Sequence, residues 1–115
     1  MYVDDTTRLR HMRDAADEAV RFVRGKTRAD LDKDRQLVLA LVKCIEIVGE
    51  AASGVSAAMR ERHPDVPWRA IVAMRNRLIH GYYEIDLDRV WDTATANLSP
   101  LLATLERIVE TDEGS

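Results

Sequence analysis

The sequence has few of the residues that form turns, cross-links or membrane spans. Only three prolines and five glycines interrupt its 115 residues, which argues against a fold of many short strands. No apolar run approaches the ~20 residues that a membrane-spanning helix needs. The single cysteine, Cys44, excludes an internal disulfide and favours a reducing compartment. The acidic start, Met1–Asp5, lacks the plan of a signal peptide, so we expect a cytoplasmic protein that does not contact a membrane.

Length and composition indicate one globular domain. A chain of 115 residues can bury one modest core, so we expect a single domain over residues 1–115. Hydrophobic residues make up 46% and charged residues 32%, the balance of a folded helical protein. The net charge of −3 argues against a nucleic-acid partner, yet residues 59–83 carry five arginines and only two acids. These arginines either form a basic region on an acidic body or are simply solvated.

Hydrophobic periodicity predicts two helices in the first half of the chain. The first runs from about Asp5 to Arg24 and stops at Gly25, a residue suited to a left-handed cap. The second begins near Ala29 and is the longest, with Gly49 in it as a point of bending or of close approach by a neighbour. Its core seam steps by three and four residues: Leu37, Leu41, Ile45, Val48, Ala52, Val55 and Met59. The apolar surface is wider than one stripe, so this helix is central in its bundle or faces a second subunit.

A short helix and a long helix are predicted for the second half. The short one, at about Pro67–His80, has proline at its first position and ends before Gly81. The long one, starting at Asp86 or Leu87 and running to Glu110, should kink just before Pro100. Four such helices predict an all-α fold, an antiparallel four-helix up-and-down bundle.

The segment Arg75–Tyr83 concentrates the groups that can carry chemistry. His80 can take or give a proton near neutral pH, and the arginines beside it can hold a phosphate. On the predicted helix Asn76 and Arg77 share a face with His80, and Arg75 borders that face. One copy makes only a shallow polar patch, whereas two copies across a two-fold axis would make a cleft. The geometry therefore favours a composite site in a homodimer.

The pattern Arg75-X4-His80-X-Tyr82 resembles the signature of the HepT branch of the HEPN superfamily. The similarity extends from about Gln36 to Leu105 in the family's order. Lys43–Ala52 is similar to its second helix, Val66–Ile71 to the start of its motif helix, and Ile85–Trp91 to the start of its last helix. The resemblance implies an HEPN-like bundle and a homodimer that can join a larger hetero-oligomer.

The resemblance also implies the toxin of a toxin–antitoxin pair, acting as a metal-independent endoribonuclease on RNA. In that reaction one His80 takes the proton from a ribose 2′-OH and the second protonates the leaving 5′-oxygen. Arg75 would stabilise charge on the phosphoryl oxygens, and Asn76 would orient the histidine or the phosphate. Arg77 and Arg69 are predicted to help bind the RNA.

Carried over residue by residue, the family pattern makes Tyr82 the target of AMP transfer. The enzyme that modifies it would be the antitoxin, an MntA-like minimal nucleotidyltransferase that uses ATP as the AMP donor. The modification would place bulk and negative charge two residues from His80. The chain itself is expected to need no metal or other cofactor, because its acids are scattered and no Cys/His ligand spacing occurs.

Each of these assignments has an alternative. A histidine in the last turn of a helix can serve the helix dipole, and Tyr82 can simply pack over the helix end. Glu46 and Glu50 are surface or interface residues, unless Glu46 pairs with an arginine of the site. For the whole protein, the alternative is a non-catalytic nucleotide- or RNA-binding regulatory partner of a nucleotidyltransferase.

Overall fold

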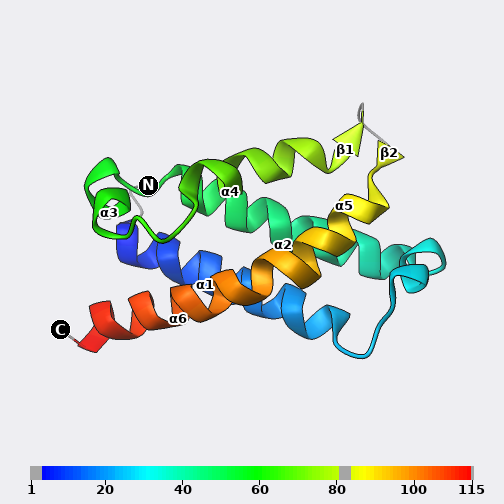
Figure 1. The fold of residues 1–115 in the computed structure, drawn as a ribbon, viewed down its shortest axis with the longest axis horizontal. Helices are drawn as coiled ribbons and strands as arrows, with labels where there is room; N and C mark the ends of the chain where they lie inside the picture. The colour runs from blue at the N-terminus through cyan, green and yellow to red at the C-terminus, as the bar shows by residue number, and fades with distance from the viewer. Residues whose placement is uncertain (1–3, 81–83, 115) are drawn as a thin grey trace.

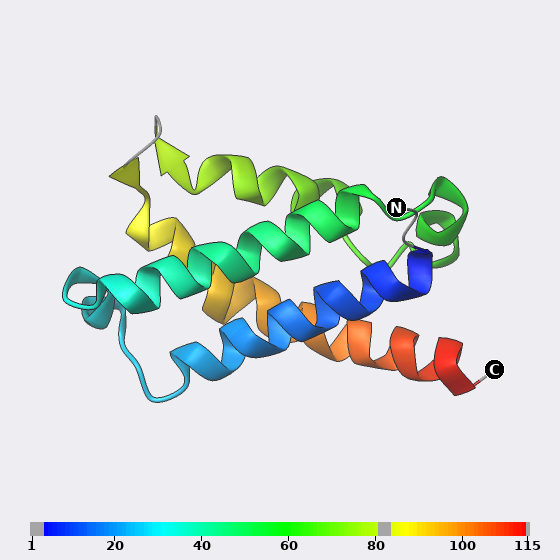
Figure 2. The same ribbon diagram turned by 180° about the vertical axis from the view of Figure 1, so that it is seen from behind.

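The protein is a helical bundle whose long elements run alternately in opposite directions (Figure 1, Figure 2). The computed structural model describes residues 4–80 and 84–114, with only the backbone described at residues 80 and 112–114. Its long helices are α1 (Asp5–Val23), α2 (Arg35–Ser53) and α6 (Leu98–Gly114). The all-α bundle predicted from the sequence is therefore confirmed.

Side-chain caps set where the first two long helices begin. The Asp4 carboxylate accepts a hydrogen bond from the Thr7 amide at 2.8 Å, and Asp34 accepts one from Leu37 at 3.0 Å. The first helix ends just before Gly25, whose φ of +77° lies in the left-handed region that favours glycine. The predicted stop at this glycine is confirmed.

The predicted second helix is in fact three elements. Arg28–Asp32 form a 3-10 helix, η1, before α2, and Ala57–Arg62 form the short helix α3 after it. Asp34 caps α2, and Ser56 caps α3 while its amide and hydroxyl both donate to the Asp5 carboxylate. The prediction of one helix from residue 29 to 59 is wrong at both ends. The sequence pattern did not show the breaks, because the apolar seam continues through them.

The third helix ends earlier than predicted. It begins at Trp68, and α4 covers Trp68–Met74, after which Arg75–Arg77 continue as the 3-10 turn η2. The chain then forms a two-residue strand, β1 (Ile79–His80), which pairs antiparallel with β2 (Glu84–Ile85). The placement of His80 in a last helical turn is therefore wrong, and the helix-dipole alternative for it loses its basis.

Backbone pairing and burial explain this early end. Ile79 lies opposite Ile85 in the ladder, and such β-branched pairs favour extended backbone. The Asp86 amide donates to the Leu78 carbonyl at 2.7 Å, and the Leu78 side chain is fully buried. The segment is thus fixed to the core just before the motif histidine, and it leaves the helix there.

The predicted fourth helix contains a π-helical interruption. The helix α5 (Leu87–Asp92) leads into a five-residue π segment, η3 (Thr93–Asn97), and α6 follows directly. The Leu98 amide donates to the Thr93 carbonyl, five residues back. An irregularity before Pro100 was expected, because proline lacks an amide hydrogen and crowds the preceding turn. It takes the form of a π segment, and the helix continues to residue 114, beyond the predicted end at 110.

One continuous core holds these elements together. The helix α1 packs against both α2 and α6, and α2 packs against α4. Large side chains from all of these layers are fully buried, among them Leu9, Met12, Leu41, Ile45, Leu78, Leu98 and Leu105. The helices α4 and α6 approach each other less closely than these pairs do. Among the residues that the structure describes, no helix is long and apolar enough to cross a membrane.

Candidate functional site

The motif segment lies at one end of the bundle, where η2 and the β1–β2 ladder follow α4 (Figure 1). The His80 backbone pairs with Glu84 in this ladder. The His80 side chain and Tyr82 lie outside the described part of the molecule. The geometry of the candidate site is therefore given by Arg75–Arg77 and the residues around them.

Arg75 crosses the surface of α2 at a glycine. A Cβ atom placed on Gly49 would lie 3.1 Å from Cδ of Arg75 and 3.4 Å from its Cβ and Cγ. The absence of a side chain at Gly49 therefore provides the space in which the apolar stem of Arg75 packs. The possibility of a close neighbour at this glycine, raised by the sequence, is confirmed.

Arg75 and Asn76 line a shallow cavity together with Glu46 and Glu50. The cavity has a volume of about 250 Å³. The two glutamates are one turn apart on α2 and flank Gly49; Glu46 is half-buried and Glu50 is exposed. No ion pair joins either glutamate to Arg75 in the described structure, although the cavity brings all three together. Glu46 thus lies in the cavity with Arg75 without the ion pair that one of its two alternatives requires.

The groups around this cavity suit binding of a ribose and its phosphate. A guanidinium can bind two phosphoryl oxygens at once, and carboxylates accept hydrogen bonds from ribose hydroxyls. Asn76 adds an exposed amide that can donate or accept. Within the part of the chain that the structure describes, no group of three or more His, Cys, Asp or Glu side chains could hold a metal ion.

Arg77 lies on a different side of α4. It lines a groove of about 390 Å³ between α4 and η3–α6, to which α5 contributes Arg89. The prediction that Asn76 and Arg77 share the face of His80 assumed a helix that continues through His80. The helical turns end at Arg77 and His80 is in a strand, so that assumption is wrong, and Asn76 and Arg77 line different hollows. Arg69 is exposed on α4 and lines neither hollow.

Comparison with protein families identifies the chain. The model of a family described as Ribonuclease HepT-like matches residues 12–108, which span α1 to α6 and include the motif. The chain belongs to the HepT-like ribonuclease family. This membership agrees with the resemblance seen in the sequence and supports a ribonuclease at the level of the family. The roles of individual residues stay predictions.

Relatives of the HepT-like chain are similar over most of their length. A protein of Thermococcus cleftensis named "Probable ribonuclease HepT" is 30% identical over 95 residues, which cover 79% of this chain and 86% of the relative. A protein of Caldanaerobacter subterraneus, named as a candidate RNase, is 30% identical over 105 residues, 91% of this chain and 94% of its own. Another candidate RNase, from Methanocaldococcus jannaschii, is 29% identical over 98 residues, which cover 85% of this chain and 81% of the relative. No solved structure gives a significant match.

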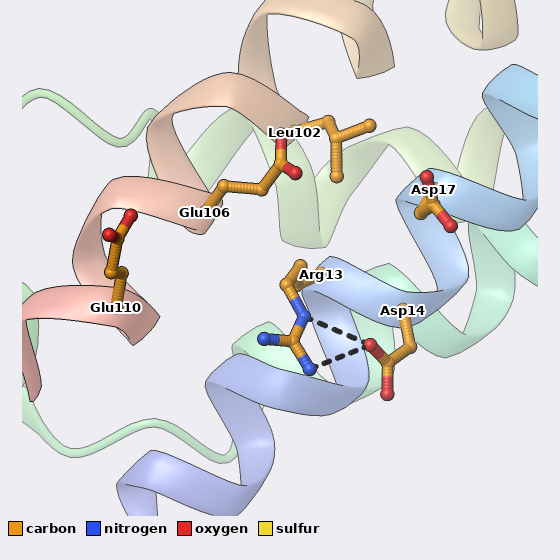
Figure 3. Close-up of a pocket in the computed structure, with 6 residues that line it drawn as sticks. All are labelled: Arg13, Asp14, Asp17, Leu102, Glu106 and Glu110. Atoms are coloured by element: carbon orange, nitrogen blue, oxygen red, sulfur yellow. Dashed lines mark hydrogen bonds and ion pairs between the residues drawn. The ribbon is translucent and has the colours of Figure 1, made fainter. Parts of the chain in front are cut away.

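A third hollow of this HepT-like protein is acidic. It has a volume of about 460 Å³ and lies between α1 and α6 (Figure 3). Asp14, Asp17, Glu106 and Glu110 line it, and Arg13 is bound to Asp14 at 2.9 Å. This excess of negative charge repels a phosphate backbone, so the hollow itself is unsuited to RNA.

Cys44 belongs to the core and not to the site. Its side chain is buried in α2, and burial raises the pKa of the thiol to about 11, with the nearby Glu18 carboxylate acting in the same direction. The thiol therefore stays protonated at neutral pH and is a poor nucleophile. The expected packing role of Cys44 agrees with this environment.

Proposed function

We propose that this protein is the toxin of a toxin–antitoxin pair, a metal-independent endoribonuclease that acts in the cytoplasm. Membership of the HepT-like ribonuclease family supports the class of reaction. The observation that carries the proposal is the cavity at the end of α4, where Arg75 and Asn76 lie together on α2 beside the segment that holds His80.

In the proposed reaction, one proton leaves the attacking 2′-oxygen and another is added to the leaving 5′-oxygen. One His80 takes the proton of a ribose 2′-OH, and the 2′-oxygen attacks the adjacent phosphorus. The bond from phosphorus to the 5′-oxygen breaks, and the second His80, or water, protonates that oxygen. Arg75 stabilises the charge on the phosphoryl oxygens, while Asn76 orients the reacting groups. Each acid or base step contributes about 10²–10⁴-fold to the rate.

The proposed site is completed by a second copy of the chain. The cavity of one chain is shallow and open, and two copies facing each other there bring two arginines and two histidines into one cleft. Two apolar side chains on the outer side of α2 are available for such a contact. Leu39 is 47% exposed on it, and Ile47, two turns further along, is only partly buried.

The proposed antitoxin is an MntA-like minimal nucleotidyltransferase that transfers AMP from ATP to Tyr82. The support is the place of Tyr82 in the sequence, two residues after His80 and seven after Arg75. An AMP group there would carry its phosphate to the arginines and block the RNA. The modified protein would then be a silent toxin.

Cleavage of total RNA in the presence of EDTA tests the proposal. The wild type should leave 2′,3′-cyclic phosphate ends, and His80→Ala and Arg75→Ala should not cleave. Arg62→Ala, at an exposed position of α3, is the matched control and should cleave normally. If a wild-type protein with unmodified Tyr82 does not cleave RNA, the non-catalytic RNA- or nucleotide-binding partner replaces this proposal. Cleavage that EDTA abolishes would contradict a metal-independent reaction.

A further inference from the structure

The edge between α4 and α6 is the open side of the bundle. The helix α4 is held by α2, and α6 is held by α1, whereas α4 and α6 come less close to each other and a groove runs between them. The π segment η3 and the exposed Pro100 lie on this edge. A groove of about 390 Å³ follows it, within the size range of pockets that hold small organic ligands.

The lining of this groove is apolar along its floor and cationic at one end. Ile71 and Leu98 are buried beneath it, and Met74 is half-buried in its wall. Arg77 and Arg89 line it from η2 and α5, the elements on either side of the β1–β2 ladder. The groove thus suits a ligand with a flat apolar body and an anionic group.

The other charges at the groove are paired. Asp65, at the far end, lies 4.0 Å from Arg107, and Arg89 lies 3.8 Å from Asp86. Arg77 has no ion-pair partner in the described part of the molecule and is exposed. It is therefore the cation with the smallest cost of turning to a phosphate.

We infer that this groove binds a nucleotide of the RNA strand next to the cleaved bond, with its phosphate at Arg77 and Arg89 and its base on the apolar floor. The inference rests on the proposed ribonuclease function. Arg75 and Arg77 line hollows on different sides of α4, so a strand that reaches both must pass over η2. Single-stranded RNA can do so, because its unstacked bases are free to enter an apolar groove.

Binding of an uncleavable RNA tests the groove. The probe is a short, fluorescein-labelled single-stranded RNA with methylated 2′-hydroxyls, which cannot attack the phosphate. Arg77→Ala and Ala96→Glu change the groove, and Arg62→Ala and Ala103→Glu make the same changes at exposed positions outside it. Both groove variants should weaken binding about tenfold, and the controls should bind like the wild type. Loss of one phosphate contact should reduce the slope of log affinity against log salt by about 0.7.

Cleavage of ordinary RNA by the same variants separates this inference from the proposed function. If the wild type cleaves and the groove variants bind and cleave like their controls, the groove inference is wrong and the ribonuclease remains. If the wild type does not cleave but only the groove variants lose binding, the groove stands and the proposed reaction fails. The groove inference is overturned if the wild type does not bind the probe, or if the groove variants change the oligomeric state.

A crosslinking measurement on the wild type covers the case of a variant that does not fold. RNA with 4-thiouridine on either side of the cleaved bond is irradiated in the complex, and the crosslinked peptide is found by mass spectrometry. Crosslinks at Met74 or Ala96 support the groove as the nucleotide site. Crosslinks that form only elsewhere on the protein contradict it.

Discussion

At the scale of single residues, replacing Gly49 with alanine should raise the stability of the protein and lower its rate of RNA cleavage. Replacing it with alanine should stabilise α2 by roughly 0.5–1 kcal/mol, because glycine inside a helix costs about that much relative to alanine. The new Cβ would lie 3.1 Å from Cδ of Arg75, so the arginine must shift. We expect Gly49→Ala to unfold at a higher temperature but to cleave RNA more slowly, and Gly49→Leu to lose cleavage. Unchanged cleavage in both variants would show that the position of Arg75 on α2 does not matter.

The two glutamates beside Arg75 should weaken RNA binding. Glu46 and Glu50 share the cavity with Arg75 and Asn76, and their negative charge opposes an approaching phosphate. Glu46→Gln and Glu50→Gln should therefore bind the methylated RNA probe more tightly at low salt, and the gain should shrink as salt screens the charges. Glu106→Gln, in the acidic hollow between α1 and α6, is the control. The methylated probe has no 2′-hydroxyl to donate to the carboxylate, so weaker binding by Glu46→Gln would contradict the expected repulsion.

Cys44 gives the protein a pH dependence on the alkaline side. Burial raises the pKa of its thiol in the folded protein to about 11 from the ordinary value of 9.0. A raised pKa means that the folded state prefers the protonated thiol, so its contribution to stability is complete below pH 9 and is lost between pH 9 and 11. We expect the free energy of unfolding to fall more steeply over this range in the wild type than in Cys44→Ala. Parallel curves from urea titrations would contradict this expectation.

At the scale of elements, the sequence predicts the helices well and their interruptions poorly. Periodicity finds α1, α4 and α6 because their apolar faces repeat with the helical period. Periodicity does not predict the breaks on either side of α2. Asp34 and Ser56 cap the helices there through hydrogen bonds, and the pattern of apolar residues does not show hydrogen bonds. The β1–β2 ladder depends on pairing across a hairpin, which helical periodicity cannot show.

The same limit applies to the candidate site. The motif could be found in the sequence, but that Asn76 and Arg77 line different hollows follows from how η2 packs between α2 and the groove beside α4, which helical periodicity does not show. Arg89 in the groove was not predicted, because it is twelve residues from Arg77 and only the tertiary fold brings them together. The only sign in the sequence that Glu50 belongs to the cavity is its position one helical turn after Glu46.

Ser56 should matter for the fold and not for the reaction. Its hydroxyl accepts a hydrogen bond from the Met59 amide at 3.2 Å and donates one to Asp5 at 2.6 Å, which joins α3 to α1. Ser56→Ala should lower the free energy of unfolding by about 1–2 kcal/mol in urea titrations. Cleavage below the unfolding transition should be unchanged, because α3 is at the end of the bundle away from the β1–β2 ladder (Figure 1). Loss of cleavage with unchanged stability would contradict the prediction that Ser56 acts on the fold and not on the reaction.

At the scale of the whole molecule, the charged hollows lie on different elements. The acidic hollow is between α1 and α6 (Figure 3), whereas the hollows that contain motif arginines are lined by η2, with α2 in one case and with α4, α5 and α6 in the other. The chain has a net charge of −3, yet the groove lined by Arg77 and Arg89 is separate from the acidic hollow, so a phosphate can reach these arginines away from that negative charge. A dimer that meets at the Arg75 cavity keeps the acidic sides outward, on the far side of both subunits.

Mixing of two inactive variants tests whether the subunits share the site. In a mixed dimer of Arg75→Ala and His80→Ala, one subunit keeps its histidine and the other keeps its arginine. If Arg75 of one subunit acts with His80 of the other, and water takes the place of the second His80 as the acid, activity should return on mixing. It should reach at most about a quarter of the wild-type rate, because half of randomly exchanged dimers are mixed and each keeps one of two pairs. The measurement is the rate of RNA cleavage before and after subunit exchange, with each variant mixed with itself as the control. No recovery, with exchange shown by mass spectrometry, would contradict this pairing of residues from two subunits.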